Sequence, residues 1–155
     1  MNYEERDPYG MYKGMNSASL RSSAALGDSK SEHGGPGPQL MGADTLIGND
    51  VVSLSDDDLG DIKELMLDMK TGHVAYAVLA FGGFLGMGEK LFAVPWSALR
   101  LDTVNKRFVL NVERERLQDA PGFDKDQWPD MADSEWARGI HAYYGSKPCA
   151  DSLNH

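Results

Sequence analysis

The chain has a single cysteine, Cys149, and therefore cannot form an internal disulfide. Small secreted domains often depend on several disulfides, whereas cytosolic proteins keep their thiols reduced. The cysteine content excludes a disulfide-stapled scaffold and indicates a reducing compartment, so we expect a cytoplasmic protein. No histidine–acid pair lies near Cys149 in the sequence, and we do not expect this thiol to act as a catalytic nucleophile.

Long hydrophobic runs are also missing. No stretch approaches the roughly 20 consecutive apolar residues that a transmembrane helix needs. The first ten residues, MNYEERDPYG, lack the basic start and the apolar core of a secretory signal peptide. We therefore expect neither a membrane span nor a cleaved leader.

Positive charge is scarce, because 15 Lys and Arg stand against 24 Asp and Glu, for a formal net charge of −9 at pH 7. Residues 1–40 hold four basic and five acidic side chains, so most of the negative charge belongs to the part expected to fold. A nucleic-acid surface needs a local basic patch. The clustered candidates are Lys106–Arg107 and the pair at Arg114 and Arg116, which lies among acidic residues. The charge pattern argues against a nucleic-acid partner.

Motifs of catalysis and cofactor binding do not occur. The sequence contains no G-x-S-x-G, H-E-x-x-H or C-x-x-C, and its four histidines lack metal-ligand spacing. Gly83–Gly88 has the glycine spacing of a phosphate loop, but Glu89 stands at the lysine position and a strand is expected to follow. We predict no catalytic, cofactor-binding or metal-ligating residue, and we expect that the protein is not an enzyme.

The segment Asp56–Asp61 (DDDLGD) is predicted to be a hairpin turn crowded with carboxylates. A calcium loop is the sharper alternative. However, Gly60 stands where the third ligand should be, and no Glu closes a twelve-residue loop. A solvated acidic turn is favoured, and cation binding at this segment stays open.

Residues 1–42 are rich in Gly, Ser, Pro and Met and poor in β-branched residues. Such a segment buries too little apolar surface to offset its ordering entropy, and we predict a flexible N-terminal tail. Tyr3, Tyr9 and Tyr12 leave two interpretations open. The segment is either an unstructured leader or a short adhesive element for a partner or for the chain's own folded domain.

The densest apolar pattern runs from Leu59 to Trp96. Leu65–Met69 is a short apolar run that a glycine turn separates from Val74–Phe81. The second run is apolar at both alternating positions, which indicates a strand buried on both faces. Lys90–Val94 returns as another strand, and Pro95 ends it because proline cannot donate to a strand ladder.

Weaker strand signals flank this core. Thr45–Ser53 is predicted to form a first strand pair or one bent strand, with a turn or bulge at Gly48–Asp50. Trp96–Leu99 is expected to form one helical turn that plugs an end of the barrel. Leu99–Asp102 and Arg107–Val112 are predicted to form a last hairpin, because Phe108, Leu110 and Val112 alternate.

From Asp61 to Trp96 the sequence follows the pattern D-I-x-x-L-x-x-D-x-x-T-G-x-x-x-Y-A-V-L-x-F-G-G-F-L-G-x-G-x-K-L-F-A-V-P-W. This pattern resembles the PRC-barrel domain, which is named after the cytoplasmic part of the photosynthetic reaction-centre H subunit. A similar domain forms half of a ribosome-maturation factor. The resemblance covers residues 43–112 and implies an all-β fold in a stand-alone bacterial protein: a small, antiparallel PRC-type β-barrel with a flexible N-terminal tail and a short helical C-terminal extension.

The C-terminal extension is predicted over residues 113–148, before a frayed end at 149–155. Glu113–Asp119 is expected to form a short helix. A longer helix is predicted at Ser134–Tyr144, with Asp133 as its N-cap and Gly145 at its C-terminal end. Its aromatic face is suited to docking on the barrel or on another chain; the face comprises Trp136, Ile140, Tyr143 and Tyr144.

A resemblance of this kind implies a fold without an activity, since one fold hosts many functions. We expect a non-enzymatic protein-interaction or assembly module, self-associating as a homodimer. Its predicted surface is Phe84, Leu85 and Met87, together with Trp136 and Tyr144. The three residues of the glycine-rich turn could instead fold back over a barrel end. A ribosome- or RNA-associated maturation factor is the alternative, by analogy with the related barrel.

Overall fold

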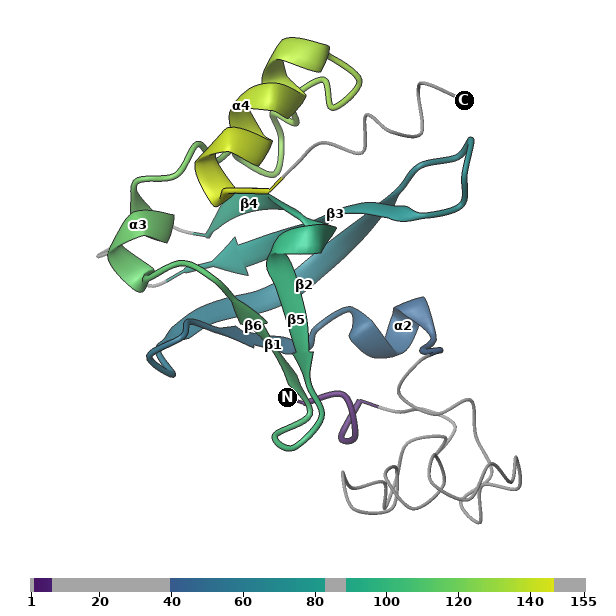
Figure 1. Cartoon of the computed structure of the whole chain (residues 1–155), viewed down its shortest axis with the longest axis vertical. Coiled ribbons are helices and arrows are strands. Elements are labelled where there is room, and N and C mark those ends of the chain that lie inside the picture. The colour runs from purple at the N-terminus through teal and green to yellow at the C-terminus, as the bar shows by residue number, and fades with distance from the viewer. Residues whose placement is uncertain (1, 7–39, 83–88, 147–155) are drawn as a thin grey trace.

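The computed structural model describes residues 2–6, 40–82 and 89–146. Ten helical and strand segments lie in these ranges (Figure 1). In chain order they are α2 (Ala43–Leu46), β1 (Asp50–Val52), β2 (Asp58–Leu67), β3 (Val74–Phe81), β4 (Lys90–Pro95), the 3₁₀ turn η1 (Trp96–Ala98), β5 (Leu99–Asp102), β6 (Arg107–Leu110), α3 (Arg114–Gln118) and α4 (Ser134–Tyr144).

The six strands form one sheet in the order β4-β3-β2-β1-β6-β5, and the sheet curls into a half-barrel (Figure 1). This architecture confirms the predicted all-β barrel with its helical extension. One feature differs from the expected antiparallel barrel, because β1 pairs with β6 in parallel, placing Val51 opposite Phe108. A parallel pair needs a long crossover, and here the whole β2–β5 region supplies it.

The central strands confirm the expectation from the apolar pattern. Every residue of β3 from Tyr76 to Phe81 is buried, so this strand is covered on both faces. The turn before β3 contains Gly72 at φ +80°, a backbone conformation that glycine adopts without a steric penalty. Pro95 is the last residue of β4. The ring of Trp96, which follows it, packs against Phe108 of β6 with 5.6 Å between the ring centroids.

The N-terminal part of the barrel differs from its prediction. Thr45 and Leu46 belong to the short helix α2, so the first strand pair predicted over Thr45–Ser53 is wrong and only Asp50–Val52 is a strand. Thr45 and Leu46 are both buried, and Asn49 donates its backbone N–H to the Leu46 carbonyl. The helical turn is therefore fixed by packing against the barrel rather than by its local sequence.

The acidic turn is also shorter than predicted, because β2 begins at Asp58 and includes Gly60 and Asp61. Gly60 has φ +101°, and a Cβ at this position would overlap the carbonyl oxygen of Ala80 on β3. The glycine therefore permits close approach of two strand backbones. Proximity of this kind is a tertiary property, and a local turn pattern does not reveal it.

The C-terminal helices match their predicted ends. Asp133 accepts a hydrogen bond from the Glu135 backbone N–H and so caps α4, whereas Gly145 ends the helix at φ +69°. Leu117 of α3 is fully buried, and Ile140 of α4 is almost so. Both belong to the same apolar cluster as the barrel interior, so the extension is part of one core.

Residues 2–6 of the predicted N-terminal tail lie within the described residues, whereas residues 7–39 lie outside them. Tyr3 is only 1 % exposed and packs against Met41 and Leu101. Of the two interpretations left open for this segment, this contact matches adhesion to the chain's own folded domain. The aromatic ring packs beside β5, which lies far away in the sequence.

Candidate interaction site

The interaction residues predicted from the sequence fall into two groups. Phe84, Leu85 and Met87 lie outside the described residues. Trp136 and Tyr144 lie on α4, and both contact the chain's own domain: Trp136 is half-buried and Tyr144 is 6 % exposed. Of the two options left open for this helix face, the structure shows docking on the barrel.

Trp136 meets the outer face of the sheet at Tyr76 of β3. The two ring centroids are 5.3 Å apart with an interplanar angle of 62°, which is the edge-to-face geometry that aromatic pairs prefer. His141, one turn further along α4, lies 5.7 Å from the same tyrosine ring. The aromatic face of α4 thus covers one end of the outer sheet face.

A second part of the extension covers the rest of β3 and β4. Val78, Ala80 and Leu91 form a buried cluster on this outer face, and Phe123 and Met131 pack over it. Leu91 and Phe123 also exchange backbone hydrogen bonds of 2.9 and 2.8 Å, forming a bridge outside the regular strands. The region after α3 therefore closes the outer face of these two strands.

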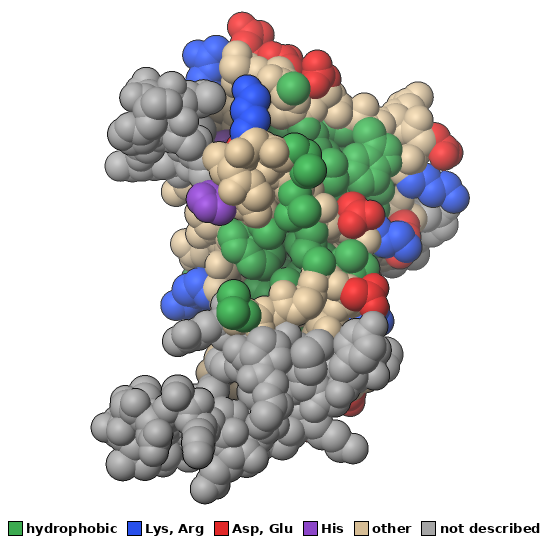
Figure 2. Space-filling model, turned by 90° about the vertical axis from the view of Figure 1, so that its right-hand side faces the viewer, with side chains coloured by type: hydrophobic (Ala, Val, Ile, Leu, Met, Phe, Trp, Pro, Cys, Tyr) green, Lys and Arg blue, Asp and Glu red, His purple; other side chains and the backbone are tan. Residues whose placement is uncertain are grey.

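Several large apolar side chains remain exposed in the described residues. They are Leu40 (70 % exposed), Leu54 (55 %), Leu67 (50 %), Met69 (86 %), Val104 (68 %) and Trp128 (43 %). Two of them, Leu67 and Met69, lie at the end of the β2–β3 hairpin. This hairpin projects at the right of Figure 1, and Figure 2 shows a band of hydrophobic side chains along that side of the molecule.

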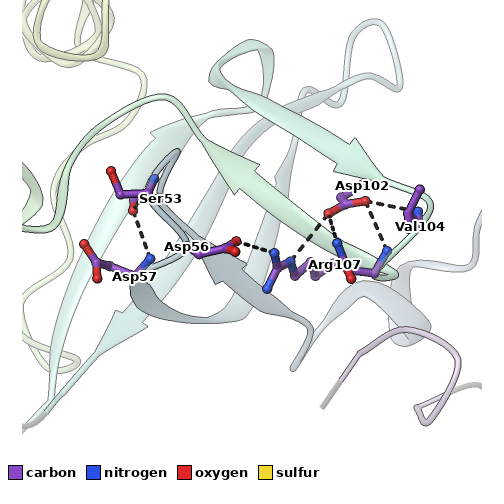
Figure 3. Close-up of polar contacts among 8 residues, drawn as sticks. Ser53, Asp56, Asp57, Asp102, Val104 and Arg107 are labelled. Atoms are coloured by element: carbon purple, nitrogen blue, oxygen red, sulfur yellow. Dashed lines mark hydrogen bonds and ion pairs between the residues drawn. The ribbon is translucent and has the colours of Figure 1, made fainter.

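The acidic turn holds its side chains in ion pairs and turn hydrogen bonds. Arg107 of β6 forms an ion pair with Asp56, as Figure 3 shows. The buried Ser53 hydroxyl accepts the Asp57 backbone N–H at 3.1 Å, and Asp58 accepts the Gly60 N–H at 2.9 Å. Among the residues that the structure describes, no three His, Cys, Asp or Glu side chains come together as metal ligands.

Arg107 also joins this turn to the β5–β6 hairpin. Its Nε lies 3.5 Å from the Asp102 carboxylate, which in turn accepts hydrogen bonds from Val104 and Asn105 (Figure 3). Partial burial opposes ionisation of Asp102, but those hydrogen bonds and the Arg107 charge outweigh it and lower the pKa of this carboxyl. The arrangement is an ion-pair network that fixes two turns relative to each other.

The basic residues that sequence analysis singled out for nucleic acid are engaged within the chain. Lys106 forms an ion pair with Glu4, and Arg107 pairs with two aspartates. Arg114 lies 5.3 Å from the Phe81 ring centroid, and Arg116 lies 4.4 Å from that of Tyr143. Each cation therefore already has an intramolecular partner.

One hollow of about 600 Å³ opens between η1, β5 and the C-terminal end of α4. Its walls include Ser97, Arg100, Asn111 and Tyr144. Burial raises the pKa of Tyr144 above its ordinary value.

The sequence did not predict where the N-terminal segment docks. Tyr3 donates its backbone N–H to the Lys106 carbonyl at 3.1 Å, and the neighbouring Glu4 forms an ion pair with the Lys106 side chain. The tyrosines of this segment were consistent with adhesion to the chain's own barrel, which was one of the two interpretations left open. The partner, Lys106, lies more than 100 residues away in the sequence, and no local pattern identifies it.

Comparison with known proteins identifies the fold family. The sequence model of the PRC-barrel domain matches residues 38–117, just over half of the chain. No curated protein sequence matches this chain. Within the described ranges, none of the helices combines the length and apolar character needed to cross a membrane. The match includes α2, all six strands and most of α3, and the chain belongs to the PRC-barrel domain family.

Proposed function

We propose that this chain is a non-enzymatic protein-interaction module that acts in the cytoplasm and self-associates as a homodimer. The observation that carries the proposal is the exposure of Leu67 and Met69 at the end of the β2–β3 hairpin. Together we call these two residues the hairpin tip. Large apolar side chains that a folded domain leaves exposed close together in the chain are candidates for a binding surface.

The chemistry of the hairpin tip suits a protein partner. Met69 has a flexible, polarisable side chain that adapts to an irregular surface, and it is 86 % exposed. Figure 2 shows further hydrophobic side chains on the side of the molecule on which the hairpin projects. Burial of such a surface against a second copy would stabilise the dimer by about 25 cal/mol for each Å² of apolar area removed from water.

The charge distribution supports a protein partner over RNA. The chain carries a net charge of −9, and the clustered cations Lys106, Arg107, Arg114 and Arg116 are all engaged with carboxylates or aromatic rings of the same chain. Phosphate binding would have to compete with these intramolecular contacts. For this reason the interaction module takes precedence over the ribosome-associated alternative.

The test is the solution mass of three full-length variants. Met69→Asp places a charge on the hairpin tip and should shift the mass measured by multi-angle light scattering toward that of a monomer. Val104→Asp makes a similar change at another exposed apolar residue, on the β5–β6 hairpin, and should leave the dimer intact. A Met69→Asp protein with the mass of the unsubstituted chain would exclude the hairpin tip.

Met87→Asp examines the surface predicted from the sequence alone in the same experiment. If both Met69→Asp and Met87→Asp reduce the mass, the interface includes the glycine-rich turn as well as the hairpin tip. If Met87→Asp alone does so, the predicted turn replaces the hairpin tip as the self-association surface. Circular dichroism of each variant confirms that the sheet is retained.

A further inference from the structure

Residues 2–6 form a compact unit, which we call the arm (Asn2–Arg6). The Asn2 backbone N–H donates to the Glu5 carboxylate at 3.2 Å, and the Glu5 N–H donates to the Asn2 side chain at 3.0 Å. The Arg6 N–H donates to the Asn2 carbonyl at 3.2 Å. These reciprocal bonds make the arm a locally closed turn that presents Tyr3 and Glu4 together.

The arm lies in a site with matching chemistry, which we call the seat (Met41, Gly48, Leu101 and Lys106). Met41 and Leu101 pack against Tyr3, whose exposed fraction is only 1 %. Lys106 contributes twice, since its carbonyl accepts the Tyr3 N–H at 3.1 Å and its ammonium pairs with Glu4. An apolar site beside a cation therefore binds an aromatic residue followed by a carboxylate.

The seat is shaped by two unusual backbone conformations. Lys106 has φ +58° within the β5–β6 turn. Gly48 has φ +89°, and a Cβ at this position would overlap the Arg6 guanidinium. Glycine is therefore required at position 48 both for its backbone angle and for contact with the arm. These contacts define a specific docking site, because backbone, apolar and charged groups all match the arm.

The arm is joined to the barrel by residues 7–39, a stretch of 33 residues. Fully extended, a stretch of this length spans roughly 100 Å. The seat of a second copy is therefore within reach of the arm, and exchange of identical elements between two copies is a low-energy route to a dimer. Two exchanged arms would fill two seats with the contacts seen here and need no new interface.

We propose that the seat is a recognition site for a tyrosine–glutamate segment and that it accepts the arm of a second copy as well as its own. This contact is separate from the hairpin tip, because it uses the residues on either side of α2, together with β5 and the β5–β6 turn. It does not depend on self-association through Leu67 and Met69. The second copy is the partner because it carries the same segment that fills the seat in this structure.

Charge reversal in two full-length chains tests the proposal. In Glu4→Lys the arm repels its own seat, and in Lys106→Glu the same repulsion occurs with opposite signs. When the two variants are mixed, each arm meets a seat of opposite charge only on the other chain. Both chains also carry Met69→Asp, so that the hairpin tip does not contribute to the measured association.

Native mass spectrometry with one isotope-labelled variant reports which pairs form. The expected result is a heterodimer, with an association constant about tenfold above that of either variant with itself, because two ion pairs replace two repulsions. Tyr3→Ala in both chains should abolish this heterodimer. Monomers alone, or pairing without preference for the mixed dimer, would overturn the proposal and leave the arm as an intramolecular contact.

A single chain that carries both Glu4→Lys and Lys106→Glu is the control for whether the seat tolerates the two substitutions. Its thermal midpoint should return toward that of the unsubstituted chain, since the ion pair is restored with opposite polarity. If the midpoint stays as low as in the single variants, Glu4 and Lys106 are not paired and the proposed recognition chemistry is wrong. Light scattering of Met69→Asp tests the hairpin tip, and mass spectrometry of the charge-reversed chains tests the seat. Either proposal can therefore fail without the other.

Discussion

The backbone amide nitrogen of Tyr3 and the carbonyl oxygen of Lys106 lie 3.1 Å apart and form a hydrogen bond between the beginning of the chain and the β5–β6 turn. This contact places the aromatic side chain of Tyr3 against Met41 and Leu101. The arm thus contributes to the stability of the domain as well as to its proposed recognition chemistry.

Tyr3→Ala should lower the free energy of unfolding by about 2 kcal/mol, the value typical of a buried large side chain. Tyr3→Phe is the matched control, because it keeps the ring that packs on Met41 and Leu101. Urea unfolding followed by circular dichroism measures both. If Tyr3→Ala is as stable as the unsubstituted chain, the arm does not contribute to folding.

Trp136→Ala should destabilise the domain by roughly 2 kcal/mol, because it removes the edge-to-face contact with Tyr76 and uncovers part of β3. Trp128→Ala is the control, since Trp128 is 43 % exposed and contacts Phe123 within the same loop. Limited proteolysis should release α4 in the first variant at lower protease concentration. Equal resistance of the two variants would mean that α4 is not held by this contact.

Asp61→Asn should stabilise the protein at neutral pH. Burial, followed by the neighbouring Glu89 charge, raises the pKa of Asp61, with a smaller contribution from Asp50 and opposition from Lys63. A carboxyl with a raised folded-state pKa reduces stability as pH rises from its unfolded value of 3.8 through the folded value.

The stabilising effect of Asp61→Asn should therefore shrink as the pH falls toward about 3, where the carboxyl is mostly protonated in both states. Asp126→Asn is the control, because it removes the same charge at an exposed position. Thermal midpoints measured across this range test the assignment. A benefit that persists unchanged in acid would show that the charge of Asp61 is not its cause.

His141 should make the domain less stable as the pH falls. Burial lowers the pKa of His141 below 6.5, and its ring nitrogens lie 2.9 Å from the Ser146 hydroxyl and 3.5 Å from that of Tyr76. Because the folded-state pKa is depressed, the stabilising contribution is present above the unfolded pKa of 6.5 and is lost below it.

Thermal midpoints recorded between about pH 7 and pH 5 should consequently decline less for His141→Gln than for the unsubstituted chain. His73→Gln serves as the comparison, since His73 is exposed and should leave the slope unchanged. The test uses slopes rather than absolute midpoints, because glutamine also alters packing. Identical slopes for all three proteins would remove His141 as the titrating group.

Salt-dependent RNA binding should be absent. The expectation follows from the net negative charge and from the intramolecular partners of the clustered cations. Filter binding with a structured RNA at low and at physiological salt provides the measurement. Binding that weakens steeply with salt would favour the ribosome-associated alternative over the interaction module.

The central strands β3 and β4 could be predicted from the sequence because their signals are local. The apolar run at Val74–Phe81 and the stop at Pro95 depend on residue types and backbone chemistry within a few positions. Asp133 and Gly145 likewise mark the ends of α4 through capping preferences that act over one helical turn. Such features need no knowledge of the rest of the fold.

The features that sequence analysis missed depend on contacts between distant segments. Gly60 allows the backbone of Ala80 to approach, and Leu46 is helical because the barrel buries it. Tyr3 is ordered by Lys106, and the composition around it pointed to a flexible tail. The candidate interaction site also depends on the fold. The exposure of Leu67 and Met69 follows from their position at the end of the β2–β3 hairpin, which their residue types do not reveal.

Sedimentation equilibrium of the unsubstituted full-length chain, over a wide range of concentrations, measures self-association without any substitution. The chain has a mass of 17.0 kDa, and we expect the measured mass to rise with concentration to a plateau of twice that value. A mass that stays at 17.0 kDa at every concentration would contradict the proposal that this PRC-barrel protein is a self-associating module.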